Sequence, residues 1–176
     1  AITDHNLCTP VPQRLNGVLL IPGCEVSTRQ GHVTGLFLEE PLDLEGLRKN
    51  GLPQGGDAVE EIHRRGGIAV LAHPYQSPGA APEDFDFRPD CVEGANARAA
   101  LKVKEANERA AALAQSLGLP AVGGSDAHSR HEVGNAYTRV EGAGLTLSEL
   151  KAALLTGNSA PVQLRNTSHL RKALSH

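Results

Sequence analysis

Short apolar, strand-like runs recur along the chain, and each adjoins a polar residue of a type that binds metals. The five runs and their neighbours are Ala1–Thr3 before Asp4 and His5, Val18–Ile21 before Glu25, Val33–Leu38 after His32, Ile68–Ala72 before His73, and Pro120–Val122 before Asp126 and His128. Barrels of alternating strands and helices gather catalytic residues at one end of their strands. The pattern therefore predicts a metal site assembled from several strand ends.

Helix-like segments alternate with the later strand-like runs. We expect helices at Asp57–Arg65, Arg98–Leu117 and Leu147–Leu155, and strands at Ile68–Ala72, Asp90–Glu93, Pro120–Gly123 and Tyr137–Val140. Asp57 and Thr146 are the expected N-caps, and Gly118 and Gly157 the expected helix ends. The run Ile68–Ala72 is apolar throughout, which is typical of a strand buried in a parallel sheet. This alternation predicts an α/β fold with βαβ units, forming one domain over residues 1–162, followed by a polar tail at 163–176.

Composition narrows the functional classes. The 176 residues carry a net charge of −3, so no basic excess favours binding to nucleic acid or to an anionic membrane. No apolar run approaches the roughly 20 residues that span a bilayer. The three cysteines are widely spaced and include no C-x-x-C pair, which favours reduced thiols and a cytoplasmic protein.

The candidate ligands are histidines and carboxylates rather than thiolates. Such a donor set suits Zn, Mn or Fe better than a structural zinc site of the cysteine type. A carboxylate such as Glu25 can bridge two cations, and paired cations activate water and bind a phosphoryl group. Asp126 and His128 occupy alternate positions, so an extended backbone would point both side chains the same way.

Five short motifs, in order, resemble those of a known superfamily. They are Ile2-Thr3-Asp4-His5-Asn6, Ile21-Pro22-Gly23-Cys24-Glu25-Val26-Ser27-Thr28, Gly31-His32-Val33, Ala72-His73-Pro74 and Gly124-Ser125-Asp126-Ala127-His128-Ser129. The order resembles the PHP (polymerase and histidinol phosphatase) superfamily of metal-dependent phosphoesterases, over residues 1 to about 138. The sequence around Glu25 and His32 is most similar to the branch of the superfamily that includes carbaryl hydrolases.

The resemblance implies a fold and a set of roles. The implied fold is a distorted seven-stranded β/α barrel that holds up to three divalent metal ions at the carboxyl ends of its strands. The implied ligands are Glu25 as a bridge, with His32 and His73 completing one site, Asp126 at the other bridged ion, and His5 and His128 at a third. Glu25, Asp126 and His128 are the implied catalytic residues. Asp4 would support the ligands, and Glu93 and Asn96 would position substrate or water.

One part of the family pattern is absent from this sequence. The family begins with a strand that carries a His-x-His motif, so we expect that strand and its helix to lie upstream of Ala1. The expected activity is hydrolysis of a small-molecule phosphate mono- or diester, nucleotides included, by metal-activated water. The alternative is a degenerate PHP module with a structural or partner-binding role.

Each candidate also has a plainer interpretation. Polar residues are common in the loops at strand ends. A histidine that opens a strand, as His32 does, is often simply half-exposed. The histidine at 63 fits a solvated helix face. Arg98 and Arg130 have the geometry to bind a phosphate. The plainer interpretation of each is an ordinary surface arginine.

Overall fold

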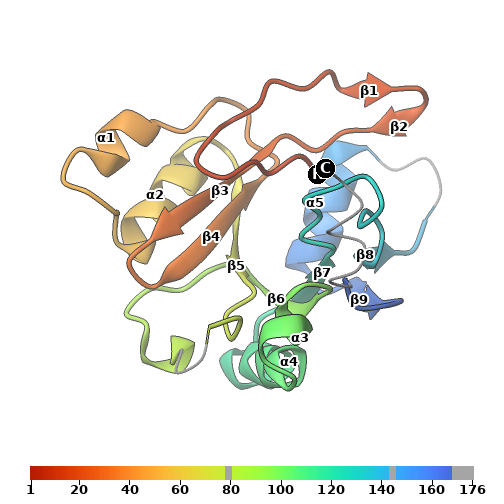
Figure 1. Cartoon of the computed structure of the whole chain (residues 1–176). Helices are drawn as coiled ribbons and strands as arrows, with labels where there is room; N and C mark the ends of the chain where they lie inside the picture. The colour runs from red at the N-terminus through yellow and green to blue at the C-terminus, as the bar shows by residue number, and fades with distance from the viewer. Residues whose placement is uncertain (78–80, 143–145, 168–176) are drawn as a thin grey trace. The chain divides into compact units, whose positions relative to one another are not determined.

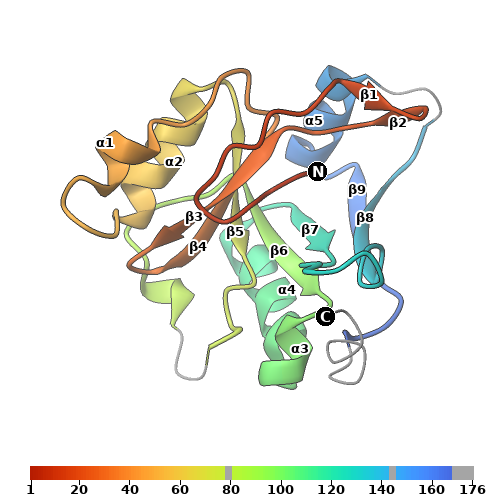
Figure 2. The same cartoon turned by 45° about the horizontal axis from the view of Figure 1, so that its top comes forward.

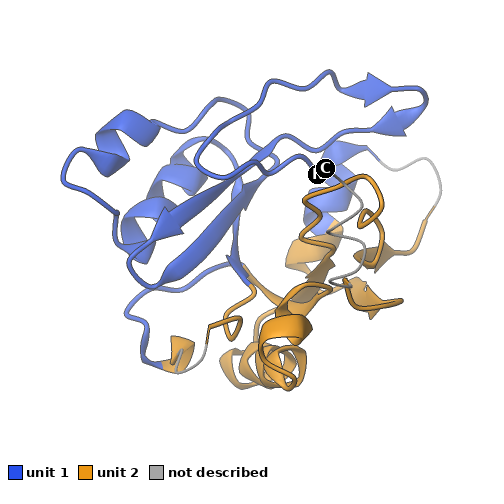
Figure 3. Cartoon of the chain, viewed as in Figure 1, with its two compact units in different colours: residues 1–72, 84–90, 144–152 blue, residues 73–83, 91–143, 153–176 orange. Residues whose placement is uncertain are grey.

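The computed structural model describes residues 1–77, 81–142 and 146–167. The chain divides into two compact units, coloured separately in Figure 3. Unit 1 comprises residues 1–72, 84–90 and 144–152, and unit 2 comprises residues 73–83, 91–143 and 153–176. Each unit is described by itself.

Unit 1 is built on three antiparallel strands and one amphipathic helix. The strands are β3 (Gly23–Thr28), β4 (Gly31–Leu36) and β5 (Ile68–Ala72), and the helix is α2 (Gly55–Arg64), which lies beside β3 and β4 in Figure 1. Strand side chains alternate between faces, so one face carries the apolar residues that pack with those of α2. This core includes Cys24, Val26, Val33, Ala58, Val59 and Ile62. The run Ile68–Ala72 is a strand, as predicted, and it pairs antiparallel with β4.

The opposite face of β3 and β4 carries polar side chains. Ser27 pairs with His32 and Glu25 pairs with Thr34 in the antiparallel register. Because side chains two residues apart share a face, Glu25 and His32 are diagonal neighbours on the face turned away from α2.

The N-terminal segment is not a strand of its own. It touches β3 and the residue before it through two isolated parallel bridges, Ile2 with Pro22 and His5 with Glu25. The run predicted at Val18–Ile21 is also shorter in the structure, where β2 (Val18–Leu19) pairs with β1 (Arg14–Leu15). Asn16 and Gly17 both have positive φ in the two-residue turn between them, which is the turn that hairpins of this length favour.

Helix α2 begins before the predicted cap. Its N-cap is Gln54, and Asp57 is the third helical residue, with its carboxylate accepting a hydrogen bond from the Gln54 amide at 3.3 Å. The prediction chose the right element and the wrong capping position, because the capping box uses an acid three residues into the helix. A short helix, α1 (Leu44–Arg48), precedes it and is capped by Asp43.

Unit 2 contains the predicted βαβ arrangement. Strands β6 (Cys91–Asn96) and β7 (Ala121–Gly124) are parallel, and α4 (Ala106–Leu117) packs along β6 in Figure 2. The single helix predicted at Arg98–Leu117 is wrong: a short helix α3 (Ala99–Lys102) ends at Val103, whose backbone is extended. The β-branched side chain of Val103 favours that conformation. Gly118 ends α4 in the left-handed conformation, as expected.

The C-terminal strands complete unit 2. Strands β8 (Ala136–Val140) and β9 (Ser159–Gln163) pair antiparallel, and α5 (Leu147–Leu155) lies between them in sequence. Thr146 caps α5, because its hydroxyl accepts a hydrogen bond from the Glu149 amide at 3.2 Å. The predicted tail starts inside β9, and its residues 164, 165 and 167 donate backbone hydrogen bonds to unit 2. Residues 168–176 lie outside the described residues.

The architecture is therefore a mixed α/β fold with antiparallel and parallel strand pairs. A one-turn 3₁₀ helix, η1, covers Pro82–Asp84. The seven-stranded barrel and the single domain over 1–162 stay predictions. Across the residues that the structure describes, none of the helices combines the length and the apolar character needed to cross a bilayer.

Candidate metal site

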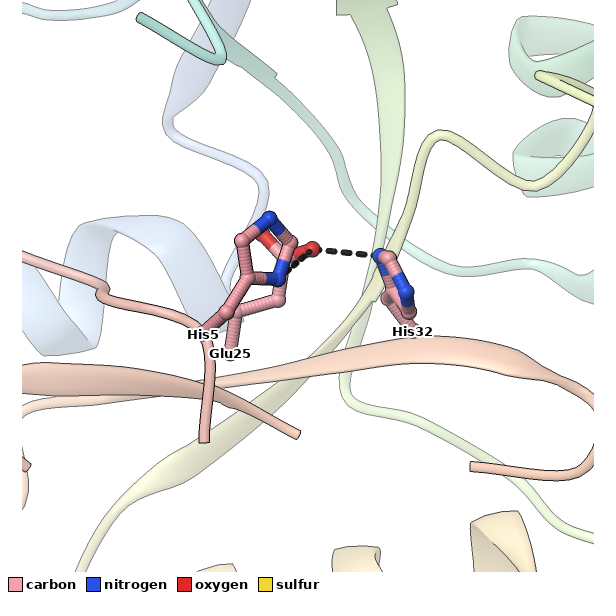
Figure 4. A group of neighbouring side chains, drawn as sticks. All are labelled: His5, Glu25 and His32. Atoms are coloured by element: carbon pink, nitrogen blue, oxygen red, sulfur yellow. Dashed lines mark ion pairs between the residues drawn. The ribbon is translucent and has the colours of Figure 1, made fainter. Parts of the chain in front are cut away.

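Three predicted ligands meet in unit 1, where His5, Glu25 and His32 point toward one another (Figure 4). One donor atom from each lies within 4.8 Å of the other two. Glu25 Oε1 is shared: it lies 2.5 Å from Nδ1 of His32 and 3.4 Å from Nδ1 of His5. Glu25 is buried, whereas His5 is exposed, so the cluster opens to solvent on the His5 side.

Backbone pairing places these three side chains. Glu25 and His32 share the polar face of β3 and β4, and the bridge between His5 and Glu25 brings the N-terminal segment alongside. The Asn6 amide donates to the Glu25 carbonyl at 2.8 Å, and the Glu25 amide donates to the Asp4 carbonyl at 3.1 Å. His5 and His32, which are 27 positions apart, are thus brought to Glu25 by β-type pairing rather than by one loop.

Asn6 holds this arrangement with its side chain. Its Nδ2 donates to Ser27 Oγ and its Oδ1 accepts from the Ser27 amide, both at 3.0 Å. Asn6 has a φ of 51°, a left-handed conformation that asparagine tolerates better than most residues. Asp4, which was predicted to support the ligands, accepts the Glu25 amide hydrogen bond with its carbonyl and a hydrogen bond from Thr9 with its carboxylate. Its supporting role stays a prediction.

The donor set fits a divalent cation of the Zn, Mn or Fe type. Two imidazoles and one carboxylate are ligands that these ions share, and none of the three donors is a thiolate. Donors about 2.0–2.2 Å from a tetrahedral zinc lie about 3.4 Å from one another. The distance between His5 Nδ1 and Glu25 Oε1 already matches that value. His32 Nδ1, which lies 2.5 Å from the same oxygen, would have to move outward to reach it.

Unit 2 brings Asp126 and His128 together. His128 Nδ1 lies 3.4 Å from Asp126 Oδ1 and 3.0 Å from the Asp126 carbonyl oxygen. The Asp126 carboxylate also accepts hydrogen bonds from Gln76 Nε2 at 3.2 Å and from Asn96 Nδ2 at 3.5 Å. Asp126 has a φ of 48°, a strained conformation for a residue other than glycine. Strain of this kind is often retained at functional sites.

A buried ion pair supports that loop. Arg98 Nη2 lies 2.5 Å from Glu132 Oε2, and Arg98 Nε donates to the Asp126 carbonyl at 3.0 Å. Glu132 Oε2 also accepts the His128 amide hydrogen bond at 2.7 Å. Arg98 is therefore buried and committed to protein groups, which corrects both sequence interpretations of it, a surface residue or a phosphate clamp. Glu132 was missed, because a lone acid in a polar stretch gives no signal in sequence.

His73, Glu93 and Asn96 form a second group in unit 2. The His73 amide donates to Glu93 Oε2 at 2.8 Å, and Asn96 Nδ2 donates to the same oxygen at 3.0 Å. Burial raises the pKa of Glu93 to about 7, against the lowering effects of His73 and the Asn96 hydrogen bond. His73 has a φ of 29°, so it too lies in a strained conformation.

The remaining predictions fall outside these groups. Arg130 is exposed, and its Nε donates to the neighbouring His131 at 3.3 Å. His63 is on α2 as expected, but it pairs with Asp90 at 2.7 Å instead of being only solvated. His5, Glu25 and His32 belong to unit 1, and the other predicted ligands belong to unit 2. The prediction that His73 completes the site of Glu25 and His32 stays a prediction.

Two archaeal proteins are similar to this chain in sequence. Both are uncharacterized proteins of Methanocaldococcus jannaschii. One is 36% identical over 104 residues, covering 55% of this chain and 57% of the relative. The other is 31% identical over 150 residues, covering 79% and 56%. The chain thus spans a little over half the length of the curated relatives it matches. A family model described as PHP-associated matches residues 104–159.

Solved structures share the fold. A two-domain protein from Bacteroides vulgatus that contains a predicted PHP-like metal-dependent phosphoesterase aligns with a TM-score of 0.59 and 20% identity, covering 92% of this chain and 55% of that one. The lesion-specific endonuclease Q of Pyrococcus furiosus aligns with a TM-score of 0.56 and 20% identity, covering 88% and 44%. An endonuclease Q complex with a 27-mer duplex that carries an abasic lesion at the active site aligns at 0.51 and 18%, also covering 88% and 44%.

The motifs, the family match and the shared fold agree with one another. The PHP-associated model matches the segment from two residues before α4 to the first residue of β9, and the donor atoms of the motif residues His5, Glu25 and His32 lie within 4.8 Å of one another. Membership of the PHP superfamily is supported by this family match together with the sequence motifs.

Proposed function

We propose that this chain is the metal-binding part of a hydrolase that cleaves phosphate esters. The observation that carries the proposal is the cluster of His5, Glu25 and His32 around one shared carboxylate oxygen. A metal-dependent hydrolase in general is supported by the PHP-like relatives, and the ester class is the finer part of the proposal.

The roles follow from the chemistry of the side chains. His5, Glu25 and His32 are proposed as ligands of one ion in unit 1. In unit 2, His73, Asp126 and His128 are the further proposed ligands, with Glu93 and Asn96 positioning substrate or water. A bound Zn, Mn or Fe ion would supply an activated water and stabilise charge on the phosphoryl oxygens.

The other proposed residues act on charge and orientation. The Glu25 carboxylate provides the negative charge that balances a dication, and it is buried, so solvent screens it little. Asn96 is buried and bonded to both Glu93 and Asp126, so it fixes the positions of two carboxylates. Arg130 is exposed, and a guanidinium there suits a substrate phosphate.

Metal binding is the first measurement. Chain stripped with chelator is titrated with Mn²⁺ and with Zn²⁺ by calorimetry, and the bound metal is measured by mass spectrometry. We expect Glu25→Gln and His32→Ala to weaken binding sharply. His63→Ala is the matched control, because it removes a histidine that pairs with Asp90 and should leave binding unchanged. A wild-type chain that binds neither ion would overturn the proposal.

Turnover is the second measurement. Hydrolysis of p-nitrophenyl phosphate and of bis-p-nitrophenyl phosphate is assayed with each metal, for wild type, His73→Ala and Asp126→Ala. We expect activity that depends on metal and is lost in both variants. Metal binding without hydrolysis of any ester would favour the alternative, a degenerate module with a structural role.

A nucleic-acid phosphodiester is the second candidate substrate. The likeness to endonuclease Q favours it, although the net charge of −3 does not. A duplex with an abasic site, assayed beside the small esters, separates the two classes. Cleavage of the duplex alone would favour the nuclease, and cleavage of the small esters alone would favour the small-molecule enzyme.

A cytoplasmic location, as the reduced thiols suggest, is part of this proposal.

A further inference from the structure

Two cysteines of unit 1 lie in contact beside the candidate metal site. Burial and then the neighbouring Cys8 side chain raise the pKa of the Cys24 thiol to about 12. Cys8 packs against the apolar cluster that contains Cys24, and its Sγ accepts a hydrogen bond from the Leu42 amide at 3.3 Å. All three cysteines of the chain lie within the described residues, and all are thiols.

The path of the backbone explains the contact. Residues 2–6 run parallel to residues 21–25 through the bridges at Ile2 and His5. The chain then continues to Cys8, on the core side of β3. Cys24 precedes Glu25 and therefore points to the opposite face of the strand, toward the same core. Each cysteine is thus one to three residues from a candidate ligand.

We propose that Cys8 and Cys24 are a disulfide-forming pair that regulates the His5–Glu25–His32 site in response to peroxide. The regulatory part rests on the proposed function. Cys24 is completely buried and Cys8 is half-buried, so an oxidant reaches Cys8 first. The Cys8 thiolate attacks hydrogen peroxide, forming a sulfenic acid and releasing hydroxide. The Cys24 sulfur then displaces the sulfenic hydroxyl, which leaves as water, so two thiols and one peroxide give one disulfide and two waters.

The bond would change the site through the backbone. A disulfide holds its sulfurs about 2.0 Å apart, closer than a hydrogen bond holds them. Closing that gap pulls the segment after His5 toward β3 and moves Cys8 Sγ away from the Leu42 amide, which now donates a hydrogen bond to it. Metal–donor distances in well-formed sites lie within about 0.2 Å of their standard values, so a shift of His5 against Glu25 should weaken binding.

The test treats the full-length chain with hydrogen peroxide and maps the products by peptide mass spectrometry. We expect a mass loss of two hydrogens and a Cys8–Cys24 cross-link that dithiothreitol reverses. Cys91→Ala is the matched control and should keep the cross-link, whereas Cys8→Ser and Cys24→Ala should each abolish it. Sulfinic acid at Cys8 without a cross-link, or a cross-link only between chains, would overturn the pairing.

Metal affinity tests the regulatory part. Mn²⁺ is the probe, because it prefers oxygen and nitrogen donors and so reports little on thiols. We expect the oxidised chain to bind Mn²⁺ about 10–100-fold more weakly than the reduced chain, the range typical of disturbed supporting groups. Equal affinity in the two forms would overturn regulation. A reduced chain that binds no Mn²⁺ would refute the proposed function, and the cross-link map would still decide the pairing.

Discussion

Arg98 and Glu132 are 34 residues apart and form an ion pair with Nη2 and Oε2 2.5 Å apart, buried in unit 2. The same two side chains bind the backbone of the loop that carries Asp126 and His128. One buried pair therefore sets the positions of two candidate ligands, although neither Arg98 nor Glu132 has the chemistry of a ligand in this arrangement.

Removing one partner of this pair should destabilise the chain strongly. We expect Glu132→Gln to lower the free energy of unfolding by about 3–5 kcal/mol, because it leaves the buried Arg98 guanidinium without its carboxylate. Urea unfolding followed by circular dichroism measures the change. Arg130→Ala, a substitution of an exposed arginine on the same loop, is the control and should stay within about 0.5 kcal/mol of wild type. Equal effects of the two substitutions would contradict the role of the pair.

The Asn6 side chain should control metal affinity without binding metal. We expect Asn6→Ala to weaken Mn²⁺ binding by about 10–100-fold, because it releases the segment that carries His5 from Ser27. Ser27→Ala removes the hydroxyl partner alone and keeps the bond from the Ser27 amide to Asn6 Oδ1, so its effect should be smaller. Calorimetric titration measures both, and a larger loss in Ser27→Ala than in Asn6→Ala would contradict the prediction.

Strands and helices were predictable from the sequence where the local residue pattern alone determines the secondary structure. The run Ile68–Ala72 is buried and extended, and Thr146 and Gly118 delimit helices as their types suggest. The break at Val103 was not predictable from helix propensity, because one β-branched residue costs a helix only a few tenths of a kcal/mol. The antiparallel pairing of β5 with β4 was also not predictable, since an apolar run suits an antiparallel strand as well as a parallel one.

The candidate ligands could be chosen from the sequence, but their grouping and the residues that hold them could not. His5, Glu25 and His32 stand out by type and by position at strand ends, but the resemblance implied a third site for His5 with His128, whereas the structure groups His5 with Glu25 and His32. Asn6 and Glu132 carry no such signal, because each depends on a partner far away in the sequence, Ser27 for Asn6 and Arg98 for Glu132. Arg98 was misjudged for the same reason: arginine is mostly exposed, and only its distant partner makes burial favourable.

Glu61 should make the stability of the chain depend on pH. Burial raises the pKa of Glu61, but hydrogen bonds from the Asp43 amide and Arg65, with the charge of Arg64, outweigh burial and hold it below its ordinary value of 4.5. A depressed pKa in the folded state means that the carboxylate stabilises the fold above the unfolded pKa. That stability is lost as pH falls below about 4.5 toward the folded pKa.

The comparison with a variant isolates this contribution. At pH 7 we expect Glu61→Gln to lower the free energy of unfolding by about 1.5–3 kcal/mol, the range for hydrogen bonds to a charged group. The difference from wild type should shrink below pH 4.5, as urea unfolding at several pH values will show. Glu60→Gln, on the exposed side of α2, should show neither effect. A Glu61→Gln deficit that stays constant down to pH 3 would refute this assignment.

The close approach of Gly35 to Ile62 should separate stability from metal binding. A Cβ at Gly35 would lie 2.9 Å from Ile62 Cγ1 and 3.3 Å from Leu38 Cδ2, inside the packed core. We expect Gly35→Ala to cost about 1–3 kcal/mol in unfolding free energy, the usual range for overpacking. Mn²⁺ affinity should change little, because Glu25 and His32 project from the other face of the strands. In an Ile62→Ala background the added methyl fills the space that the isoleucine left, so Gly35→Ala should cost less there than in wild type. Urea unfolding of the four chains gives this coupling free energy, and an equal cost of Gly35→Ala in both backgrounds would show that the contact with Ile62 is not the cause.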